Sequence, residues 1–200
     1  MPKGYDAVGK SLDGLVVGEM GIGNTTTAAA LACALFGGEA ADWTGPGTGL
    51  DASGIALKTR AVAAAIEFHK DDIGDPVEAL RRVGGRELAA MAGAVLAARH
   101  KRVPVILDGF VATAAVAVSE KTVPGALDHC VAGPVSGEPG HRRLLAALGK
   151  EPLLDLGRRL GEAAGAGVWL CALQSVPAPQ SGLEDCVVSP VGGQGGAQRW

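Results

Sequence analysis

Residues that could bind a phosphorylated sugar lie close together in residues 16–27, which read VVGEMGIGNTTT. The apolar start is typical of a strand, and the alanine-rich continuation is typical of a helix. Gly21 and Gly23 allow positive φ angles and close approach to a ligand, and the unpaired N–H groups at a helix start favour an anion such as phosphate. Glu19 would repel a phosphate, but its carboxylate can accept hydrogen bonds from sugar hydroxyls. The combination predicts a site for a phosphorylated sugar.

A second glycine-rich segment follows at residues 42–51, with the sequence DWTGPGTGLD. Its three glycines and one proline exclude a regular helix, and a helical pattern resumes only at about residues 53–68. Lys58 on that helix is within reach of the loop, where it can supply a cation beside a bound phosphate. A solvated lysine on the helix surface is the alternative interpretation.

A second strand–glycine–helix unit repeats the arrangement. Residues 103–107 form a strand pattern, and Asp108 and Gly109 lead into a helix of small residues at 111–119. Two such units indicate an α/β protein with a parallel sheet and crossover helices, in a Rossmann-like three-layer arrangement. Ligands bind beyond the carboxyl ends of such strands, so Glu19 and Asp108 are expected at one rim of the sheet. Both acids could instead complement the dipole of the helix that follows.

The other segments are interpreted as scaffold. Residues 126–141 read as a loop, because glycines and prolines recur throughout them. The remaining expected elements are a strand at 12–17 and helices at 25–36, 87–100 and 142–148, with another helix that starts at Asp75-Pro76 and ends before Gly84-Gly85.

The loop at 126–141 contains Asp128, His129, Ser136 and His141, which are the residue types of a hydrolase triad. A serine nucleophile of that kind normally lies in a G-x-S-x-G elbow between a strand and a helix. No such elbow surrounds Ser136, so the sequence does not favour hydrolysis.

Composition excludes several other classes of protein. The 200 residues are 48% hydrophobic and 20% charged, which indicates a globular domain, and a net charge of −3 offers no basic surface for nucleic acid. The four cysteines are far apart in the sequence, so neither a zinc site nor a disulfide framework is predicted. There is no signal-peptide pattern, and the longest apolar run, residues 103–118, is too short to cross a bilayer. We therefore expect a cytoplasmic protein with reduced thiols.

The run GEMGIGNTTTAAAL resembles the nicotinate-nucleotide–dimethylbenzimidazole phosphoribosyltransferase family, whose members make the lower-ligand nucleotide of cobamides. Further motifs appear in the order of the family: GTGLD with a lysine after it, VILDGF, SGEPGHRRLLAALGKEPLLDL and RLGE. The resemblance covers about residues 14–165. It implies that the phosphoribosyl group of nicotinate mononucleotide is transferred to 5,6-dimethylbenzimidazole, giving α-ribazole 5′-phosphate and nicotinate in cobalamin biosynthesis.

The resemblance also implies roles for particular residues. Without it, Glu162 of the RLGE motif would be interpreted as a solvated helix residue. With it, Glu162 is the general base of a pentosyltransferase. Nucleotide binding is implied near Gly21, Gly47, Lys58 and Ser136, with Glu19 close to the ribose. The two substrates are small molecules, no metal or other cofactor is implied, and the family suggests a homodimer.

The sequence departs from the family pattern in three places. The family's chains carry a long segment ahead of the matching region, which helps to build the benzimidazole pocket, so we expect an N-terminally truncated member with an incomplete small helical part. The usual MRLGEG becomes RRLGEA, so an alanine replaces the glycine beside Glu162. Residues 1–173 are expected to form the phosphoribosyltransferase-like α/β domain, and the Pro- and Gly-rich residues 174–200 a disordered tail.

Three functions stay open at this point. The chain can be an active enzyme, a truncated chain that binds the nucleotide without turning it over, or an unrelated phosphosugar-binding domain. Calorimetry with nicotinate mononucleotide separates the third function from the other two. Product formation after dimethylbenzimidazole is added separates the first two from each other.

Overall fold

The computed structural model describes residues 1–9 and 12–158 of the 200-residue chain. Glu162 and the predicted tail at residues 174–200 therefore lie outside the described residues. The helices are α1 (Pro2–Ala7), α2 (Asn24–Phe36), α3 (Ala40–Trp43), α4 (Ala52–His69), α5 (Pro76–Val83), α6 (Arg86–His100), α7 (Gly109–Thr122) and α8 (Pro139–Ala147). The strands are β1 (Leu15–Val17), β2 (Val105–Leu107), β3 (Cys130–Ser136) and β4 (Pro152–Arg158).

These strands form one sheet in the order β1-β2-β3-β4, and each pairs in parallel with its neighbour. Val17 pairs with Leu107, which in turn pairs with Ala132, so the ends of β1 and β2 lie level at one edge. Parallel neighbours need crossover connections: α7 joins β2 to β3, and α8 joins β3 to β4. The predicted α/β class, with a parallel sheet and crossover helices, is confirmed.

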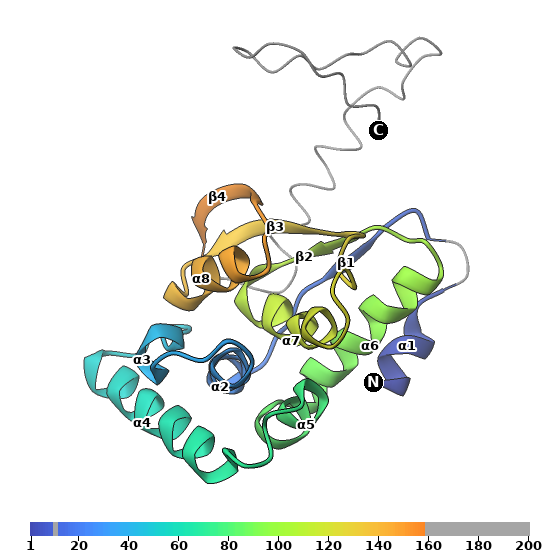
Figure 1. Ribbon diagram of the computed structural model, residues 1–200. Coiled ribbons are helices and arrows are strands. Elements are labelled where there is room, and N and C mark those ends of the chain that lie inside the picture. The colour runs from blue at the N-terminus through green and yellow to red at the C-terminus, as the bar shows by residue number, and fades with distance from the viewer. Residues whose placement is uncertain (10–11, 159–200) are drawn as a thin grey trace, which may run out of the picture.

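The helices of the described part lie on one side of the sheet (Figure 1). Because each new strand is added on the same side of the previous one, right-handed crossovers bring the connecting helices to one face. On β2, Val105 and Leu107 are buried, whereas Ile106 between them is partly exposed. Val131 pairs with Ile106 and is 41% exposed. The described residues thus form the sheet and one helical layer of the expected three-layer arrangement.

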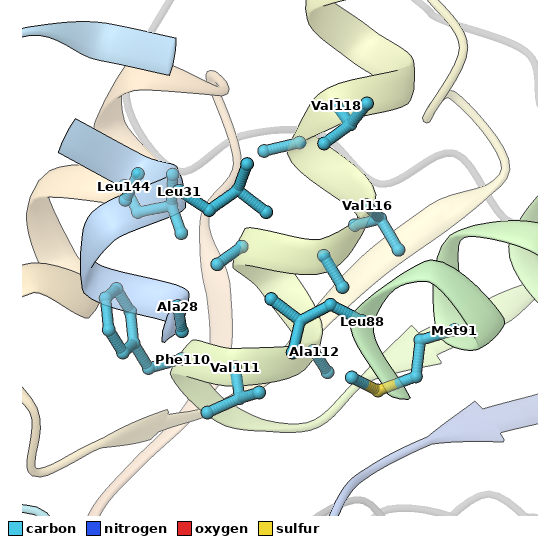
Figure 2. Packing of buried hydrophobic residues seen from close by; sticks show 14 of the residues in the cluster. Ala28, Leu31, Leu88, Met91, Phe110, Val111, Ala112, Val116, Val118 and Leu144 are labelled. Atoms are coloured by element: carbon cyan, nitrogen blue, oxygen red, sulfur yellow. The ribbon is translucent and has the colours of Figure 1, made fainter. Parts of the chain in front are cut away.

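Helix α7 lies at the centre of the core. All its residues from Gly109 to Ser119 are buried, and it packs against α2, α5, α6, α8 and β3. Figure 2 shows Val116 of α7 in a cluster with Leu31 of α2 and Leu88 of α6. A helix that is surrounded on all sides has to be apolar on all sides, which explains why the sequence of α7 has no polar face.

The sequence predicts a loop over residues 126–141, and this prediction is wrong because these residues include β3 and the start of α8. The glycine in β3 serves close strand packing rather than a turn: a Cβ on Gly133 would lie 2.9 Å from the carbonyl oxygen of Leu107 on β2. Pro134 adjoins a register shift in the pairing with β4, which is a position where a strand tolerates a residue without an N–H. The first strand is also shorter than predicted, because it starts at Leu15.

Short local signals predict the helix boundaries well. The Asp75 carboxylate caps α5 and accepts hydrogen bonds from the N–H groups of Val77 and Glu78, both at 2.9 Å. Pro76 is the first residue of α5, as expected for a residue without an N–H. Gly84 and Gly85 separate α5 from α6. These three features depend only on residues that are neighbours in the chain, so they can be predicted from the sequence alone.

Candidate active site

A cavity of about 470 Å³ lies beyond the carboxyl ends of β1, β2 and β3. Its lining comes from residues 19–25 after β1, 109–111 after β2, 136–138 at the end of β3 and 47–48 between α3 and α4. This is the edge of the sheet where the sequence predicts a ligand. Four of the predicted site residues line the cavity, namely Glu19, Gly21, Gly47 and Ser136.

The two glycines of the loop after β1 are required for different reasons. Gly23 is the N-cap of α2 and has a φ of 84°, a left-handed conformation that favours glycine. Gly21 has no positive φ, contrary to the prediction. A Cβ at Gly21 would lie 3.0 Å from Nδ2 of Asn24, so space rather than backbone conformation favours glycine there. Asn24 and Thr25, the first two residues of α2, then line the cavity, so the N-terminus of this helix lies at the cavity wall.

Glu19 is held at the cavity rim by Asn24, the first residue of α2. The Asn24 Nδ2 donates a hydrogen bond to the Glu19 Oε2, and Asn24 is only 7% exposed. A carboxylate fixed in this way can accept hydrogen bonds from ligand hydroxyls. Sequence reasoning missed Asn24, although an amide directly after a left-handed glycine was an available signal.

Lys58 of α4 is buried behind the cavity lining and is not a solvated surface lysine. It is 5% exposed, and its Nζ donates hydrogen bonds of 2.9 Å to Thr25 Oγ1 and to the carbonyl oxygen of Gly45. Burial lowers the pKa of Lys58, and the nearby Glu138 carboxylate opposes that shift. The ammonium group lies behind Gly47 and Thr25, which line the cavity themselves.

Glu138 joins the start of α8 to the second glycine loop. Its Oε1 accepts a hydrogen bond of 2.7 Å from the N–H of Gly47, and its Oε2 lies 3.7 Å from the Lys58 Nζ. Gly45 packs directly on this carboxylate, because a Cβ there would lie 2.7 Å from Glu138 Oε2. Glu138 also lines the cavity. Sequence reasoning gave it no role, since its contacts connect positions 91 residues apart.

His141 links two of the loops that line the cavity. Its Nδ1 accepts a hydrogen bond of 3.0 Å from the N–H of Ser136, so its Nε2 carries the proton and lies 3.1 Å from Thr113 Oγ1. Thr113 in turn donates to the carbonyl oxygen of Gly109 at 2.7 Å. Burial and the neighbouring Arg142 lower the pKa of His141 to about 4, so the ring is neutral at pH 7.

These contacts do not form a hydrolase triad. His141 meets the backbone N–H of Ser136, not its hydroxyl, and Ser136 Oγ instead accepts a hydrogen bond of 3.4 Å from the Glu138 N–H. His129 lies 3.1 Å from the carbonyl oxygen of Val95, on another part of the molecule. Asp108 ends β2 at the predicted edge, but it is 2% exposed and is not part of the cavity lining.

Other kinds of site are not seen in residues 1–9 and 12–158. This part of the chain has no cluster of three or more His, Cys, Asp or Glu side chains that could hold a metal. None of its helices combines the length and apolar character needed to cross a membrane. Cys33 and Cys130 are buried free thiols, and burial raises the pKa of Cys130 to about 12.

Known proteins are similar to most of this chain. A family model named DBI_PRT and described as a phosphoribosyltransferase matches residues 4–180. Two curated relatives carry the name nicotinate-nucleotide–dimethylbenzimidazole phosphoribosyltransferase. The one from Agrobacterium fabrum is 55% identical over 183 residues, which are 92% of this chain and 53% of the relative. The one from Cereibacter sphaeroides is 58% identical over 180 residues, 90% of this chain and 53% of the relative.

A solved structure agrees with these sequence matches. The crystal structure of CobT from Thermus thermophilus is 42% identical in sequence and superimposes with a TM-score of 0.80, covering 86% of this chain and 52% of that one. This chain spans about half the length of the curated relatives it matches.

Proposed function

This chain belongs to the DBI_PRT phosphoribosyltransferase family, and we propose that it supplies the nucleotide-binding part of a pentosyltransferase. The substrates are nicotinate mononucleotide and 5,6-dimethylbenzimidazole, and the products are α-ribazole 5′-phosphate and nicotinate. The main support is the cavity beyond β1, β2 and β3. Four of the residues that the family's motifs imply lie in the lining of this cavity. The relatives' names supply the reaction.

We assign the phosphate of the nucleotide to the end of the cavity between the start of α2 and Gly47. The N-terminus of α2 suits an anion, and Gly47 brings its backbone close to the first turn of α2, because a Cβ there would lie 3.2 Å from Thr25 Oγ1. Lys58 lies behind both segments and adds positive charge. Ser136, which also lines the cavity, offers a hydroxyl.

Glu19 is proposed to bind the ribose. Its carboxylate lines the cavity and is oriented by Asn24. A carboxylate accepts hydrogen bonds from the sugar hydroxyls and repels the phosphate, so Glu19 favours the orientation that brings the ribose, and not the phosphate, beside it. The apolar side chains of Met20 and Ile22, which also line the cavity, suit an aromatic ring beside the ribose.

The proposed reaction displaces nicotinate from C1′ of the ribose. A nitrogen of dimethylbenzimidazole forms the new bond to C1′, and the electron pair of the old C1′–N bond returns to the nicotinate ring. The benzimidazole ring loses its proton to Glu162, the proposed general base. β4 runs parallel to β3 and ends at Arg158, four residues before Glu162.

Two measurements test this function. Nicotinate mononucleotide is titrated into the purified chain by calorimetry, and dimethylbenzimidazole is then added while α-ribazole 5′-phosphate is followed by chromatography. Glu162→Gln should lower turnover by about 10²- to 10⁴-fold with nearly unchanged nucleotide affinity, as expected when a general base is lost. Full turnover in that variant contradicts the role of Glu162. Binding without product in the unaltered chain would instead favour a nucleotide-binding role without catalysis.

We also propose that the chain acts as a homodimer in the cytoplasm. The buried free thiols Cys33 and Cys130 suit a reducing compartment. An exposed apolar stripe on α4 supports association with a second copy. The stripe consists of Leu57, Ala61, Ala64 and Phe68, which are all exposed. Leu57 is 61% exposed and Phe68 is 82% exposed. The members are spaced alternately by four and three residues, as in the contact of two packed helices.

The stripe is self-complementary under the twofold symmetry of a dimer. In an antiparallel contact, Leu57 meets the partner subunit's Phe68. Ala64→Arg should therefore reduce the mass measured by sedimentation equilibrium. Ala63→Arg, at an exposed position on another side of α4, is the matched control and should leave the mass unchanged.

A further inference from the structure

The proposed phosphate site already holds a negative charge. Glu138 lines the cavity and is 8% exposed, whereas Lys58, the cation of the same site, does not line it. A ligand phosphate entering the cavity therefore meets the carboxylate of Glu138 as well as that of Glu19. A carboxylate beside the proposed phosphate position requires an explanation, because like charges at short range in a partly buried site repel strongly.

Glu138 occupies a donor that a phosphate could use. The N–H of Gly47 donates to Glu138 Oε1 at 2.7 Å, and this bond fixes the glycine loop against the start of α8. Gly47 has a left-handed φ of 57°. The direction of its N–H therefore depends on the conformation of the glycine loop, which the bond to Glu138 fixes. While this bond exists, the N–H of Gly47 is directed at a carboxylate and is not free to bind a ligand.

Glu138 is also the counter-charge of Lys58. The Lys58 ammonium is buried and donates to two neutral oxygens, of Thr25 and Gly45, so the Glu138 carboxylate at 3.7 Å is its nearest ionic partner in the described part of the chain. Glu138 Oε2 receives no hydrogen bond from the described residues and is buried beside Gly45. One of its two oxygens thus holds the loop, and the other offsets a buried cation.

We propose that Glu138 is an internal counter-anion of the phosphate site. It positions Gly47 and Lys58 before a ligand arrives, and its charge weakens the binding of phosphate-bearing ligands, which favours release of a phosphorylated product. It is a positioning residue that acts through Gly47 and Lys58. This inference rests on the proposed binding of a nucleotide phosphate in this cavity.

The test compares Glu138→Gln with the unaltered chain. Glutamine keeps an oxygen that can accept from the Gly47 N–H and removes the negative charge. Glu67→Gln, at an exposed surface ion pair, changes the net charge equally and is the matched control. Three probes are titrated by calorimetry: nicotinate mononucleotide, inorganic phosphate and nicotinate riboside, which lacks the phosphate.

Glu138→Gln should bind nicotinate mononucleotide and inorganic phosphate about 3- to 10-fold more tightly, the scale of one removed like charge in a partly screened site. Its affinity for the riboside and the affinities of the Glu67→Gln control should not change. Its melting temperature should fall, because Lys58 loses its counter-charge. A purely structural role would lower the melting temperature without tightening phosphate binding, and that result overturns the proposal.

A second variant keeps the proposal testable if Glu138→Gln does not fold. Glu138→Asp retains the charge but shortens the side chain away from Gly47, which frees the Gly47 N–H. Any gain in phosphate affinity should therefore stay below the gain of about 3- to 10-fold expected when the charge is removed. A gain of about 3-fold or more would mean that the occupied N–H, and not the charge, weakens phosphate binding, and this result overturns the proposal. If inorganic phosphate binds as expected but nicotinate mononucleotide does not, the proposed function fails while the role of Glu138 stands. If neither binds to any of these proteins, both are wrong.

Discussion

The two walls of the cavity are held in place very differently. The first, the glycine-loop wall (residues 18–23), carries Met20 and Ile22 with exposed fractions of 83% and 109%. The second, the braced wall (residues 136–141 with residues 45–47), contains Glu138 and His141, which are 8% and 1% exposed. Side-chain hydrogen bonds between distant segments fix the braced wall, whereas the hydrogen bond from Asn24 to Glu19 joins the glycine-loop wall to the helix directly after it.

The two walls therefore differ in what they contribute: the braced wall mainly to stability, and the glycine-loop wall mainly to ligand binding. The braced wall is set by the folded core, so its shape and charge exist before a ligand arrives. The glycine-loop wall has few buried side chains, and segments of that kind move most easily. We therefore expect substitutions in the braced wall to change stability and substitutions in the glycine-loop wall to change mainly ligand binding.

The largest effect is expected for Lys58→Met. This change leaves the Glu138 carboxylate buried without its cation and should lower the free energy of unfolding by about 3 to 5 kcal/mol, as for other broken buried ion pairs. Urea unfolding followed by circular dichroism measures it. The double variant Lys58→Met/Glu138→Gln should regain much of the loss, since no unpaired charge remains. A loss below about 1 kcal/mol in the single variant would mean that the pair does not brace this wall.

A pH effect of nearly the same size is expected from His141. Its pKa is about 4 in the folded protein and 6.5 in the unfolded chain, so between these values the unfolded chain binds the additional proton. Stability is therefore complete above about pH 6.5 and falls as the pH drops towards 4. At about 1.4 kcal/mol per pKa unit, the loss is about 3 kcal/mol.

Urea unfolding at pH 7 and pH 4.5 measures this effect. Burial also lowers the pKa of His129, so the comparison needs a variant without the His141 ring. His141→Gln should be less stable at pH 7 and should show a flatter dependence on pH. An unchanged slope in that variant assigns the pH effect to other groups.

A smaller effect is expected for Asn24→Ala in the glycine-loop wall. The substitution removes the hydrogen bond to Glu19 and should cost about 1 kcal/mol of stability. Nucleotide affinity should fall further, because the Glu19 carboxylate is no longer oriented towards the ribose. Calorimetry with nicotinate mononucleotide and with inorganic phosphate separates the two contributions: phosphate binding should be nearly unaffected if Asn24 acts through Glu19.

The smallest effect on stability is expected for Met20→Ala and Ile22→Ala. Both side chains are exposed, so each change should alter the free energy of unfolding by no more than about 0.5 kcal/mol. Binding of the aromatic base should weaken instead, which fluorescence titration with dimethylbenzimidazole can detect. Phe110→Ala is the contrasting control, because Phe110 lines the same cavity with 2% exposure and its loss should cost about 3 kcal/mol or more.

The parts of the fold that could be predicted from the sequence are those that depend on neighbouring residues. The strand–glycine–helix units, the Asp75 cap and the break at Gly84-Gly85 depend only on neighbouring residues, and the structure confirms them. β3 was missed because its glycine and proline are typical of a turn. In the structure, Gly133 is needed because a Cβ there would lie too close to the carbonyl oxygen of Leu107 on the adjacent strand. A pattern along one segment cannot show which other segment lies against it.

The same distinction between local and long-range contacts applies to the residues of the candidate site. Glu19, Gly21, Gly47 and Ser136 were predicted from motifs, and they do line the cavity, although their roles in binding stay predictions. Glu138 and Asn24 were missed, and His141 was considered only for a hydrolase triad. The contacts of Glu138 and His141 connect elements that meet only in the folded protein. Lys58 was predicted as a phosphate contact but is buried one layer behind the lining. Glu162 lies outside the described residues and stays a prediction.

The complete burial of α7 has a consequence for how the chain is made. α7 is buried on every side by segments that precede it, α2, α5 and α6, and by segments that follow it, β3 and α8. During synthesis the alanine-rich face of α2 therefore has to wait until α7 has emerged from the ribosome before the two can pack. Such late, long-range contacts slow folding. Until α7 has emerged, α2 can pack only on α3, α4 and α5, and the face of α2 that contacts α7 stays exposed to water.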